Sequence, residues 1–240
     1  MSDEINDLGQ PVGAPVPGWT PPPRPPRQPM AGAWCRLEPL DPDRHAPSLD
    51  AANRLDPSGA NWTYMSYGPF ATFDEYRAWV RNAAAGDDPL FFAIIDNRTG
   101  TAVGVASFMR IDPPNGVIEI GHLNFAPPLQ RTPAATEAVS LMMARAFALG
   151  YRRVEWKCDA LNAPSRRAAL RLGFSFEGVF RQAVVVKGRN RDTAWYAVID
   201  RDWPELREVH RRWLDPLNFD ADGRQLTALS ALSAPRALRA

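Results

Sequence analysis

One loop of the sequence has the composition of an anion-binding site. A candidate strand ends at Phe125, and the loop after it leads into a helix that we expect from Pro133 to about Leu149. Small residues allow a ligand to approach the backbone closely, and the first turn of a helix offers free amides to an anion. The loop suits a pyrophosphate, although many strand-to-helix loops of this composition bind nothing. Its candidate binding residues are Gln130, Arg131, Thr132, Pro133, Ala134 and Ala135.

A second segment places a hydroxyl at the start of a short helix. A candidate strand from Val154 to Cys158 is followed by Asn162 and Ser165, and a helix then runs from Ser165 to Leu172. A hydroxyl and the positive end of a helix dipole both favour a nearby anion, such as a thiolate. The alternative is that Ser165 is an ordinary N-cap, a position that serine favours.

Together, the two segments resemble the GNAT acetyltransferases, most closely the RimJ/RimL-like group that acetylates protein N-termini, including those of ribosomal proteins. The family has Gln/Arg-x-x-Gly-x-Gly/Ala at its pyrophosphate loop, and Gln130, Pro133 and Ala135 stand at these positions. The resemblance spans about residues 34–203. Its other matching residues are Asn162, Ser165, Gly173 and Phe174, then Phe176-Glu177-Gly178, Lys187-Gly188-Arg189, Asp192 and Tyr196.

The resemblance implies an α/β fold of three layers, α/β/α, with a central mixed sheet that is splayed open to receive acetyl-CoA. It implies that residues 130–135 bind the pyrophosphate and that Phe125 offers backbone groups to the pantetheine arm. Asn162 would hydrogen-bond the same arm, and Ser165 would lie near the sulfur. Because Pro133 lacks an amide hydrogen, the phosphate contacts are expected to differ from the family pattern or to be weaker.

Attack of an amine on a thioester needs a deprotonated amine, stabilisation of the oxyanion and neutralisation of the leaving thiolate. Related enzymes place a Glu, a candidate base, where this chain has Val184. His122 is our first substitute because imidazole titrates near neutral pH, or else it is a core histidine. Glu119 is the second, unless it pairs with an arginine. Glu177 braces the hairpin in our interpretation.

The aromatic loop over residues 62–70 lies where this family builds its acceptor wall. Aromatic side chains there could clamp a flat or cationic acceptor, or they could simply fill space over the sheet. The candidate acceptor-binding residues are Trp62, Tyr64 and Tyr67.

These residues need a sheet and helices to position them. Periodicity and turn residues predict strands near 34–37, 90–96, 102–111, 117–125 and 154–158, and a hairpin of strands 176–187 and 192–199. Helices are expected to begin after Asp41, after Thr72 with Glu75 as a capping box, at Pro133, at Ser165 and near Pro204.

Three parts of the chain are expected: a proline-rich arm over 1–32, an acetyltransferase domain over 33–215 and a C-terminal tail over 216–240. The arm is extended in our interpretation. It is either a strap held by Val12, Val16 and Trp19 or a ligand for a partner. The chain after Asp220 is expected to fray.

Composition limits the possible partners. The 240 residues carry 28 basic and 27 acidic side chains, which gives no support for a nucleic-acid or membrane partner. There is no signal-peptide layout, so we expect a cytoplasmic protein. Cys35 and Cys158 lie far apart and form no metal-ligand spacing, so no metal is expected.

Three functions remain open from the sequence. The first is an acetyl-CoA-dependent N-acetyltransferase acting on a protein N-terminus or another primary amine. The second acetylates a small amine, such as an antibiotic or a polyamine. The third is a non-catalytic acyl-CoA-binding module. The expected partners are acetyl-CoA and the acceptor, and the protein is expected to be a monomer or a homodimer.

Overall fold

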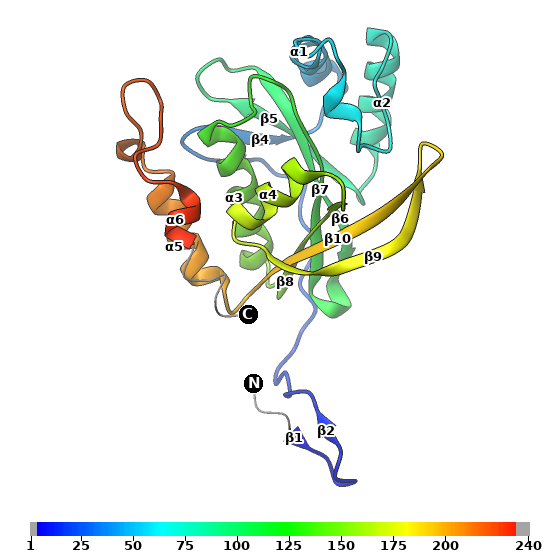
Figure 1. The fold of residues 1–240 in the computed structure, drawn as a ribbon, viewed down its shortest axis with the longest axis vertical. Helices are drawn as coiled ribbons and strands as arrows, with labels where there is room; N and C mark the ends of the chain where they lie inside the picture. The colour runs from blue at the N-terminus through cyan, green and yellow to red at the C-terminus, as the bar shows by residue number, and fades with distance from the viewer. Residues whose placement is uncertain (1–3, 234–240) are drawn as a thin grey trace.

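The computed structural model describes residues 4–233, and its centre is a mixed sheet of eight strands (Figure 1). Across the sheet the order is β3-β4-β5-β6-β7-β8-β10-β9. Neighbouring strands run antiparallel, except that β7 and β8 are parallel. The strands are β3 (Met30–Ala31), β4 (Cys35–Pro39), β5 (Leu90–Asp96), β6 (Ala102–Asp112), β7 (Val117–Phe125), β8 (Arg153–Asp159), β9 (Ser175–Val186) and β10 (Arg189–Ile199).

Helices cover both faces of this sheet (Figure 1). On one face lie α1 (Pro42–Asn53) and α2 (Phe73–Ala85), and on the other lie α3 (Pro133–Ala148), α4 (Ala163–Arg171) and α5 (Trp203–Trp213). Alternate side chains of β5 enter the two cores, Phe92 on the α3 side and Phe91 on the α1–α2 side, because strand residues point alternately to opposite faces. This three-layer arrangement confirms the predicted fold class.

The sheet opens in its middle, between β7 and β8. The two strands pair only over Val117–Arg153, Ile118–Val154 and Glu119–Glu155. Beyond Glu119, β7 continues alongside β6 and β8 continues alongside β10, so the two strands separate. A register shift in the β6–β7 pairing and a left-handed backbone at His122 (φ 51°) lie within this unpaired part of β7. The predicted splay of the central sheet is therefore present.

Side-chain caps fix the starts of the helices. The Asp41 side chain accepts the amides of Asp43 and Arg44 at the start of α1. The predicted capping box of Thr72 and Glu75 begins α2, and the Thr132 hydroxyl accepts the Ala135 amide at the start of α3. The predictions of these three helix starts are confirmed.

A buried carboxylate joins α3 to the start of β4. The side chain of Glu137 accepts the amides of Ala33, Trp34 and Cys35 at 2.7–2.8 Å. Gly32 leaves room for this contact, because a Cβ at that position would lie 2.3 Å from the Glu137 Cδ. The helix that begins at the candidate phosphate loop therefore also holds an outer strand of the sheet.

The β9–β10 hairpin turns more tightly than the sequence predicted. The second strand was predicted from residue 192, but it begins earlier, because Arg189 and Asn190 already pair with Val186 and Val185. Lys187 and Gly188 both have left-handed backbones, as a two-residue hairpin turn requires. At the tip, Lys187 Nζ donates to the carbonyl of Trp62 at 2.9 Å, so the hairpin reaches across to the aromatic loop.

The proline-rich arm packs along the domain from Trp19 onward. The Trp19 indole donates to the Pro114 carbonyl at 3.1 Å and lies under the Arg152 guanidinium. Arg24 pairs with Asp88, and Met30 is buried where β3 joins the sheet. Val12 and Val16 stay exposed. A small hairpin of β1 (Glu4–Ile5) and β2 (Pro11–Val12) precedes this segment and lies away from the sheet (Figure 1).

The C-terminal segment is more ordered than the sequence predicted. Phe219 and Gln225 form a β-bridge, and the Gln225 side chain accepts the Trp213 indole N–H at 2.9 Å. In α6 (Leu229–Ser233) the Leu229 side chain is buried in the main core. The expectation of fraying after Asp220 is thus wrong as far as residue 233, because a buried leucine anchors this segment. Residues 234–240 of the predicted tail lie outside the described part.

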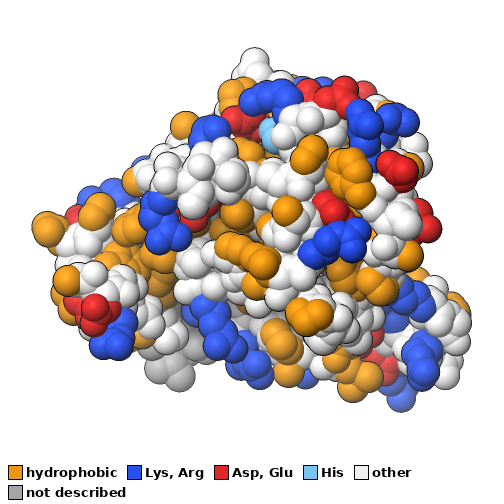
Figure 2. All heavy atoms as spheres, turned by 90° about the horizontal axis from the view of Figure 1, so that it is seen from above, with side chains coloured by type: hydrophobic (Ala, Val, Ile, Leu, Met, Phe, Trp, Pro, Cys, Tyr) orange, Lys and Arg blue, Asp and Glu red, His pale blue; other side chains and the backbone are white. Residues whose placement is uncertain are grey.

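Two surface properties bear on partners. On the face seen in Figure 2, basic and acidic side chains are interspersed among hydrophobic ones. Within residues 4–233, no helix is long and apolar enough to span a bilayer.

Two deletions test whether the arm is a strap. Removing residues 1–17 should leave the free energy of unfolding unchanged, because it spares Trp19 and all later contacts. Removing residues 1–31 should lower it by about 2 kcal/mol or more, since burial of Met30 contributes about 1.5–3 kcal/mol and the half-buried Trp19 adds less. Chemical denaturation of both variants measures this, and equal stability of the two would contradict the strap.

Candidate active site

Ser165 lies in the first turn of α4, directly after β8, on one side of the opening. The cap of α4 is Asn162, whose Oδ1 accepts the Ser165 amide at 3.1 Å. The interpretation of Ser165 as an N-cap is therefore wrong. The helix begins two residues earlier than expected, because Pro164 fits the first turn of a helix, where a missing amide hydrogen costs nothing.

The hydroxyl of Ser165 is held by a buried tryptophan. Trp156 Nε1 donates to the Ser165 Oγ at 3.0 Å. An indole N–H can only donate, so the hydroxyl is the acceptor in this bond and keeps its own hydrogen for another partner. The group beside it is the Cys158 thiol, a weak acceptor whose pKa is raised by burial. Ser165 can therefore give its hydrogen to a stronger acceptor, such as a thiolate.

The candidate phosphate loop offers two amides. Thr132 Oγ1 accepts the Ala135 amide at 3.2 Å, so that amide is occupied. The amides of Arg131 and Ala134 have no acceptor among the described residues. Arg131 has a left-handed backbone (φ 62°) and an exposed side chain at the start of α3. Pro133 occupies the first turn of the helix. The loop thus combines two free amides, a helix N-terminus and a cation, which together suit a phosphate group.

The carbonyl of Phe125 is already occupied. It accepts Gln130 Nε2 at 2.8 Å and Asn61 Nδ2 at 3.2 Å. A carbonyl oxygen has two lone pairs, so these bonds use both. The structure therefore gives Gln130 a place beside the end of β7, where it ties the loop to the strand.

His122 lies on β7, on the side of the opening that faces the aromatic loop. Its ring stacks on Tyr67 and contacts Phe91, and its Nδ1 is 3.3 Å from the Tyr67 hydroxyl. Burial, reinforced by the charge of Arg110, lowers the pKa of His122 to about 4. The expectation that this imidazole titrates near neutral pH is wrong for this reason. His122 is neutral at pH 7, and with its hydrogen on Nδ1 it has a free acceptor at Nε2.

The three aromatic candidates have different surroundings. Trp62 is 6% exposed and packs against Tyr67, Phe70 and Tyr76, so its side chain belongs to the core. Tyr67 lies between Trp79 and His122, and burial raises its pKa, so it stays protonated. Tyr64 donates to the Leu161 carbonyl at 3.2 Å. Of the three, Tyr67 is the one that contacts His122.

Glu119 is bound by two cations where the strands part. Arg110 Nη1 lies 2.8 Å and Lys157 Nζ lies 3.1 Å from its Oε2. Lys157 is also 2.7 Å from Glu155 and 3.7 Å from the centre of the Trp195 ring. The structure does not bring Glu119 into hydrogen-bonding contact with His122. The alternative interpretation, in which Glu119 pairs with an arginine, matches this geometry.

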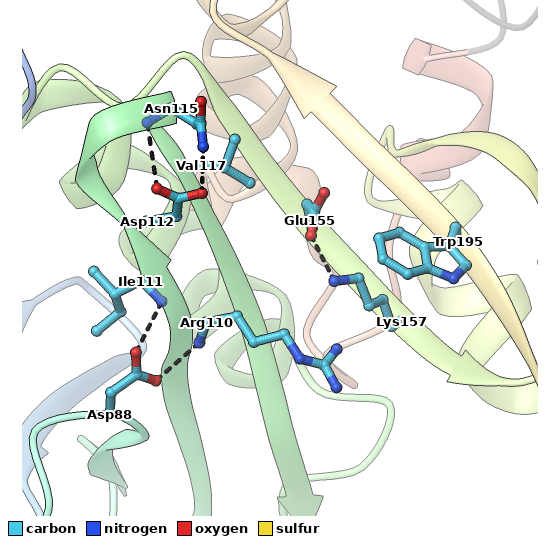
Figure 3. Close-up of a pocket in the computed structure, with 9 residues that line it drawn as sticks. All are labelled: Asp88, Arg110, Ile111, Asp112, Asn115, Val117, Glu155, Lys157 and Trp195. Atoms are coloured by element: carbon cyan, nitrogen blue, oxygen red, sulfur yellow. Dashed lines mark hydrogen bonds and ion pairs between the residues drawn. The ribbon is translucent and has the colours of Figure 1, made fainter. Parts of the chain in front are cut away.

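A pocket of about 570 Å³ lies over these ion pairs (Figure 3). In Figure 3 the side chains of Arg110 and Lys157 extend toward each other from β6 and β8, with Trp195 on β10 beside Lys157. Burial alone would raise the pKa of Glu155, but Lys157 and Arg153 outweigh it and the pKa is lowered. The lining residues are Asp88, Arg110, Ile111, Asp112, Asn115, Val117, Glu155, Lys157 and Trp195.

Sequence reasoning missed Trp156, Arg110 and Lys157. The sequence did contain a sign of the ion pairs around Lys157, because Arg153, Glu155 and Lys157 alternate in charge on one face of a strand. The contact of Trp156 with Ser165 depends on how α4 returns over β8, and no spacing in the sequence encodes it. Among the described residues, there is also no group of three or more His, Cys, Asp or Glu placed to hold a metal ion.

The fold and these motifs define the class of protein. The profile of the acetyltransferase (GNAT) domain, Acetyltransf_3, matches residues 35–175. The chain therefore belongs to the GNAT acetyltransferases, and it is an N-acetyltransferase.

Relatives with solved structures support this assignment. A GCN5-related N-acetyltransferase from Brucella melitensis is 48% identical, with a TM-score of 0.89, over 91% of this chain and 100% of that one. A GNAT-family structure from Chromobacterium violaceum is 40% identical, with a TM-score of 0.76, over 81% and 98% of the two chains. The protein named "uncharacterized N-acetyltransferase p20" of Bacillus licheniformis is 28% identical over 58% of this chain and 80% of its own length.

More distant structures share the fold. One is the Salmonella typhimurium acetyl transferase described as modifying the N-terminal serine of ribosomal protein L7/L12, at 23% identity and a TM-score of 0.61. Another is the microcin C7 self-immunity acetyltransferase MccE, in complex with acetyl-CoA and AMP, at 21% identity and a TM-score of 0.62.

The Trp156–Ser165 hydrogen bond allows a test of whether Ser165 donates a hydrogen to the leaving thiolate. Ser165→Ala should lower kcat about a hundredfold, the low end for general acid assistance. Trp156→Phe keeps a ring but loses the N–H, and should lower kcat by several-fold. The double variant should be no slower than Ser165→Ala alone, because Trp156 acts through the hydroxyl.

Trp34→Phe is the matched control, because the Trp34 indole also makes one hydrogen bond, to the Leu214 carbonyl at 2.9 Å. It should lose stability without losing kcat. Additive losses in the double variant, or full turnover in a folded Ser165→Ala, would contradict the assignment.

Proposed function

We propose that this enzyme transfers acetyl from acetyl-CoA to a primary amine, with a protein N-terminal α-amine as its first acceptor. The observation that carries the proposal is the opening between β7 and β8, with His122 on one strand and Ser165 directly after the other. Direct attack of the amine needs no covalent enzyme intermediate. It needs groups that orient the amine, stabilise charge and protonate the leaving thiolate.

The residues of the opening fit acetyl-CoA, which would supply an acetyl group activated as a thioester. Arg131 and Ala134 offer free amides at the N-terminus of α3 for the pyrophosphate. Within residues 4–233, the backbone edges of β7 after Glu119 and of β8 after Glu155 face no partner strand on the side of the opening. They can pair with the amide groups of a pantetheine arm. Asn162 keeps its amide nitrogen for the same arm, because only its Oδ1 caps α4.

The chemical roles follow from the surroundings of each side chain. Ser165, polarised by Trp156, donates to the leaving sulfur. His122 is neutral, and its Nε2 can accept a hydrogen bond from the attacking amine. The Tyr67 hydroxyl fixes the ring of His122. With a pKa of about 4, His122 is too weak a base to deprotonate an ammonium ion at pH 7, so the amine has to arrive neutral.

An α-amine suits this requirement better than a side-chain amine. Its pKa is about 7.7–8.0, against about 10.4 for lysine, so a larger fraction is neutral at pH 7. This argument favours a protein N-terminus over a polyamine, whose amines are strongly basic.

The second candidate, a small amine acceptor, is favoured by the pocket of about 570 Å³, which falls within the usual size range of small-molecule sites. Two buried free cysteines are compatible with the reducing cytoplasm.

A panel of short peptides and polyamines, incubated with acetyl-CoA, tests the proposal. Release of the CoA thiol that depends on the peptide, with acetylation located at the α-amine by mass spectrometry, is the expected result. If only the polyamines are acetylated, the N-terminal acceptor is wrong and the small-amine alternative is supported.

The pH profile tests His122. We expect kcat/KM for an α-amine to rise about tenfold per pH unit from pH 5.5 to 7.5 and to level near pH 8, because the acceptor itself titrates there. His122→Gln should lower kcat/KM at every pH but keep the same rise between pH 5.5 and 7.5, since His122 is neutral throughout that range. A flat profile in His122→Gln would show that His122 is the titrating base and would contradict the pKa of about 4.

The phosphate loop is tested by CoA affinity. Arg131→Glu should raise the Kd of CoA at least tenfold, because a charge-assisted contact contributes about 1.5–3 kcal/mol. The affinity for pantetheine, which lacks the pyrophosphate, should not change. Arg201→Glu is the control for charge alone, because Arg201 is exposed and follows β10, whose end at Ile199 pairs with Arg153 at the opposite end of the sheet from the loop. Equal CoA affinity of Arg131→Glu and the native protein by calorimetry would place the phosphates elsewhere.

A further inference from the structure

The pocket of Figure 3 lies over the point where β7 and β8 separate. It is lined from the open face of the sheet, opposite the face that carries α3 and the phosphate loop. A ligand in this pocket therefore approaches the opening from the side that the pyrophosphate does not use. In the proposed reaction that side belongs to the acceptor.

The carboxylates of the pocket are already bound to other groups of the chain. Asp88 accepts the amides of Arg110 and Ile111, and Asp112 accepts both the amide and the side chain of Asn115. Glu155 pairs with Arg153 and Lys157. These acceptors have partners within the protein before any ligand arrives.

The two cations of the pocket differ in their exposure and in how many of their N–H donors already have a partner. The Lys157 side chain is 4% exposed, and its ammonium group meets Glu119, Glu155 and the Trp195 ring. The Arg110 side chain is 56% exposed. Of its five N–H donors, one is bound to Glu119, and no other side-chain partner is present among the described residues. The group of the pocket that can still bind a ligand is therefore the Arg110 guanidinium, a positively charged hydrogen-bond donor.

The backbone of Arg110 is held in a conformation that directs this side chain. Arg110 has a left-handed backbone (φ 46°), which is uncommon for a residue with a Cβ. The Asp88 carboxylate bonds the amides of both Arg110 and Ile111, at 2.8 and 3.0 Å, and so stabilises this conformation. Strained residues persist where the surrounding structure fixes them, and they are frequent at ligand-binding sites.

We propose that Arg110 binds a carboxylate of the acceptor, so that the enzyme prefers N-termini with an acidic residue close behind the α-amine. A guanidinium bound on one edge keeps its other N–H groups for a planar carboxylate, which matches its geometry. The proposal rests on the proposed function, because it assigns the acceptor of that same site.

The length of the strand sets the position of the acidic residue. Glu119, which holds Arg110, precedes His122 by three residues, a separation of at most about 10 Å, because the strand bulges at His122. A peptide bound to Arg110 through a side-chain carboxylate has to cover this distance to bring its amine to His122. An aspartate at the second or third position of an extended peptide has this reach.

Matched peptides test the proposal on the full-length enzyme. Ala-Asp-Ala-Ala amide and Ala-Ala-Asp-Ala amide are each compared with the peptide that has Asn in place of Asp, so that only the charge differs. We expect kcat/KM to be roughly tenfold higher for at least one Asp peptide than for its Asn partner, because Arg110 is half exposed and its contact is partly screened. Binding of the same peptides to the CoA-saturated enzyme, measured by calorimetry, should show the same preference.

Variants assign the preference to Arg110. Arg110→Gln should abolish the discrimination, read as the ratio of kcat/KM for the Asp peptide to that for its Asn partner, whereas Arg110→Lys should keep part of it. Arg98→Gln is the control. Arg98 is an exposed arginine that pairs with a buried carboxylate, Asp96, at 3.0 Å, at the opposite end of β6 from the pocket. It should keep the full discrimination.

The outcomes separate this proposal from the proposed function. If no peptide is acetylated, the N-terminal acceptor is wrong, and the calorimetry still decides whether Arg110 selects a carboxylate. If Asp and Asn peptides are acetylated and bound equally well, the function holds and the role of Arg110 is wrong. Discrimination that persists in Arg110→Gln would also overturn it.

Discussion

The early end of the pairing between β7 and β8 is the constraint on which the site depends. Three residue pairs hold these strands together, and beyond Glu119 each strand keeps a partner on its outer side only. Unpaired strand edges inside a sheet are unusual, because buried backbone groups need hydrogen-bond partners. A ligand with its own amide groups can supply them, and the proposed pantetheine arm carries such groups.

The ion pairs at the closed end of this opening compensate for the lost backbone pairing. Glu119, Lys157 and Glu155 join β7 to β8 through side chains at the last paired residues, and Arg110 and Arg153 extend the series on either side. Removing one member would leave a buried charge with one partner fewer, which is costly. The series therefore fixes where the strands part, and it places the exposed guanidinium of Arg110 beside that point.

Local signals in the sequence were sufficient for most of the fold. The Thr72–Glu75 capping box, the Thr132 cap and the apolar strands follow from short-range chemistry that survives in the folded chain. The site was harder, because its properties depend on contacts between distant segments. Sequence alone suggested His122, but Phe91, Tyr67 and Arg110 lower its pKa only once the sheet is folded. Ser165 was likewise recognisable from its motif, whereas its partner Trp156 was not.

Glu137 has a consequence for the dynamics of the chain. Its carboxylate bonds three consecutive amides at 33–35, in the connection that enters an outer strand of the sheet. Such amides usually exchange with solvent through local fraying, independently of distant helices. Here all three share one acceptor group on α3, so they can open only together and only when that group is withdrawn. Their exchange rates therefore report on α3, and a ligand that stiffens the start of this helix would slow hydrogen exchange at a strand it never touches.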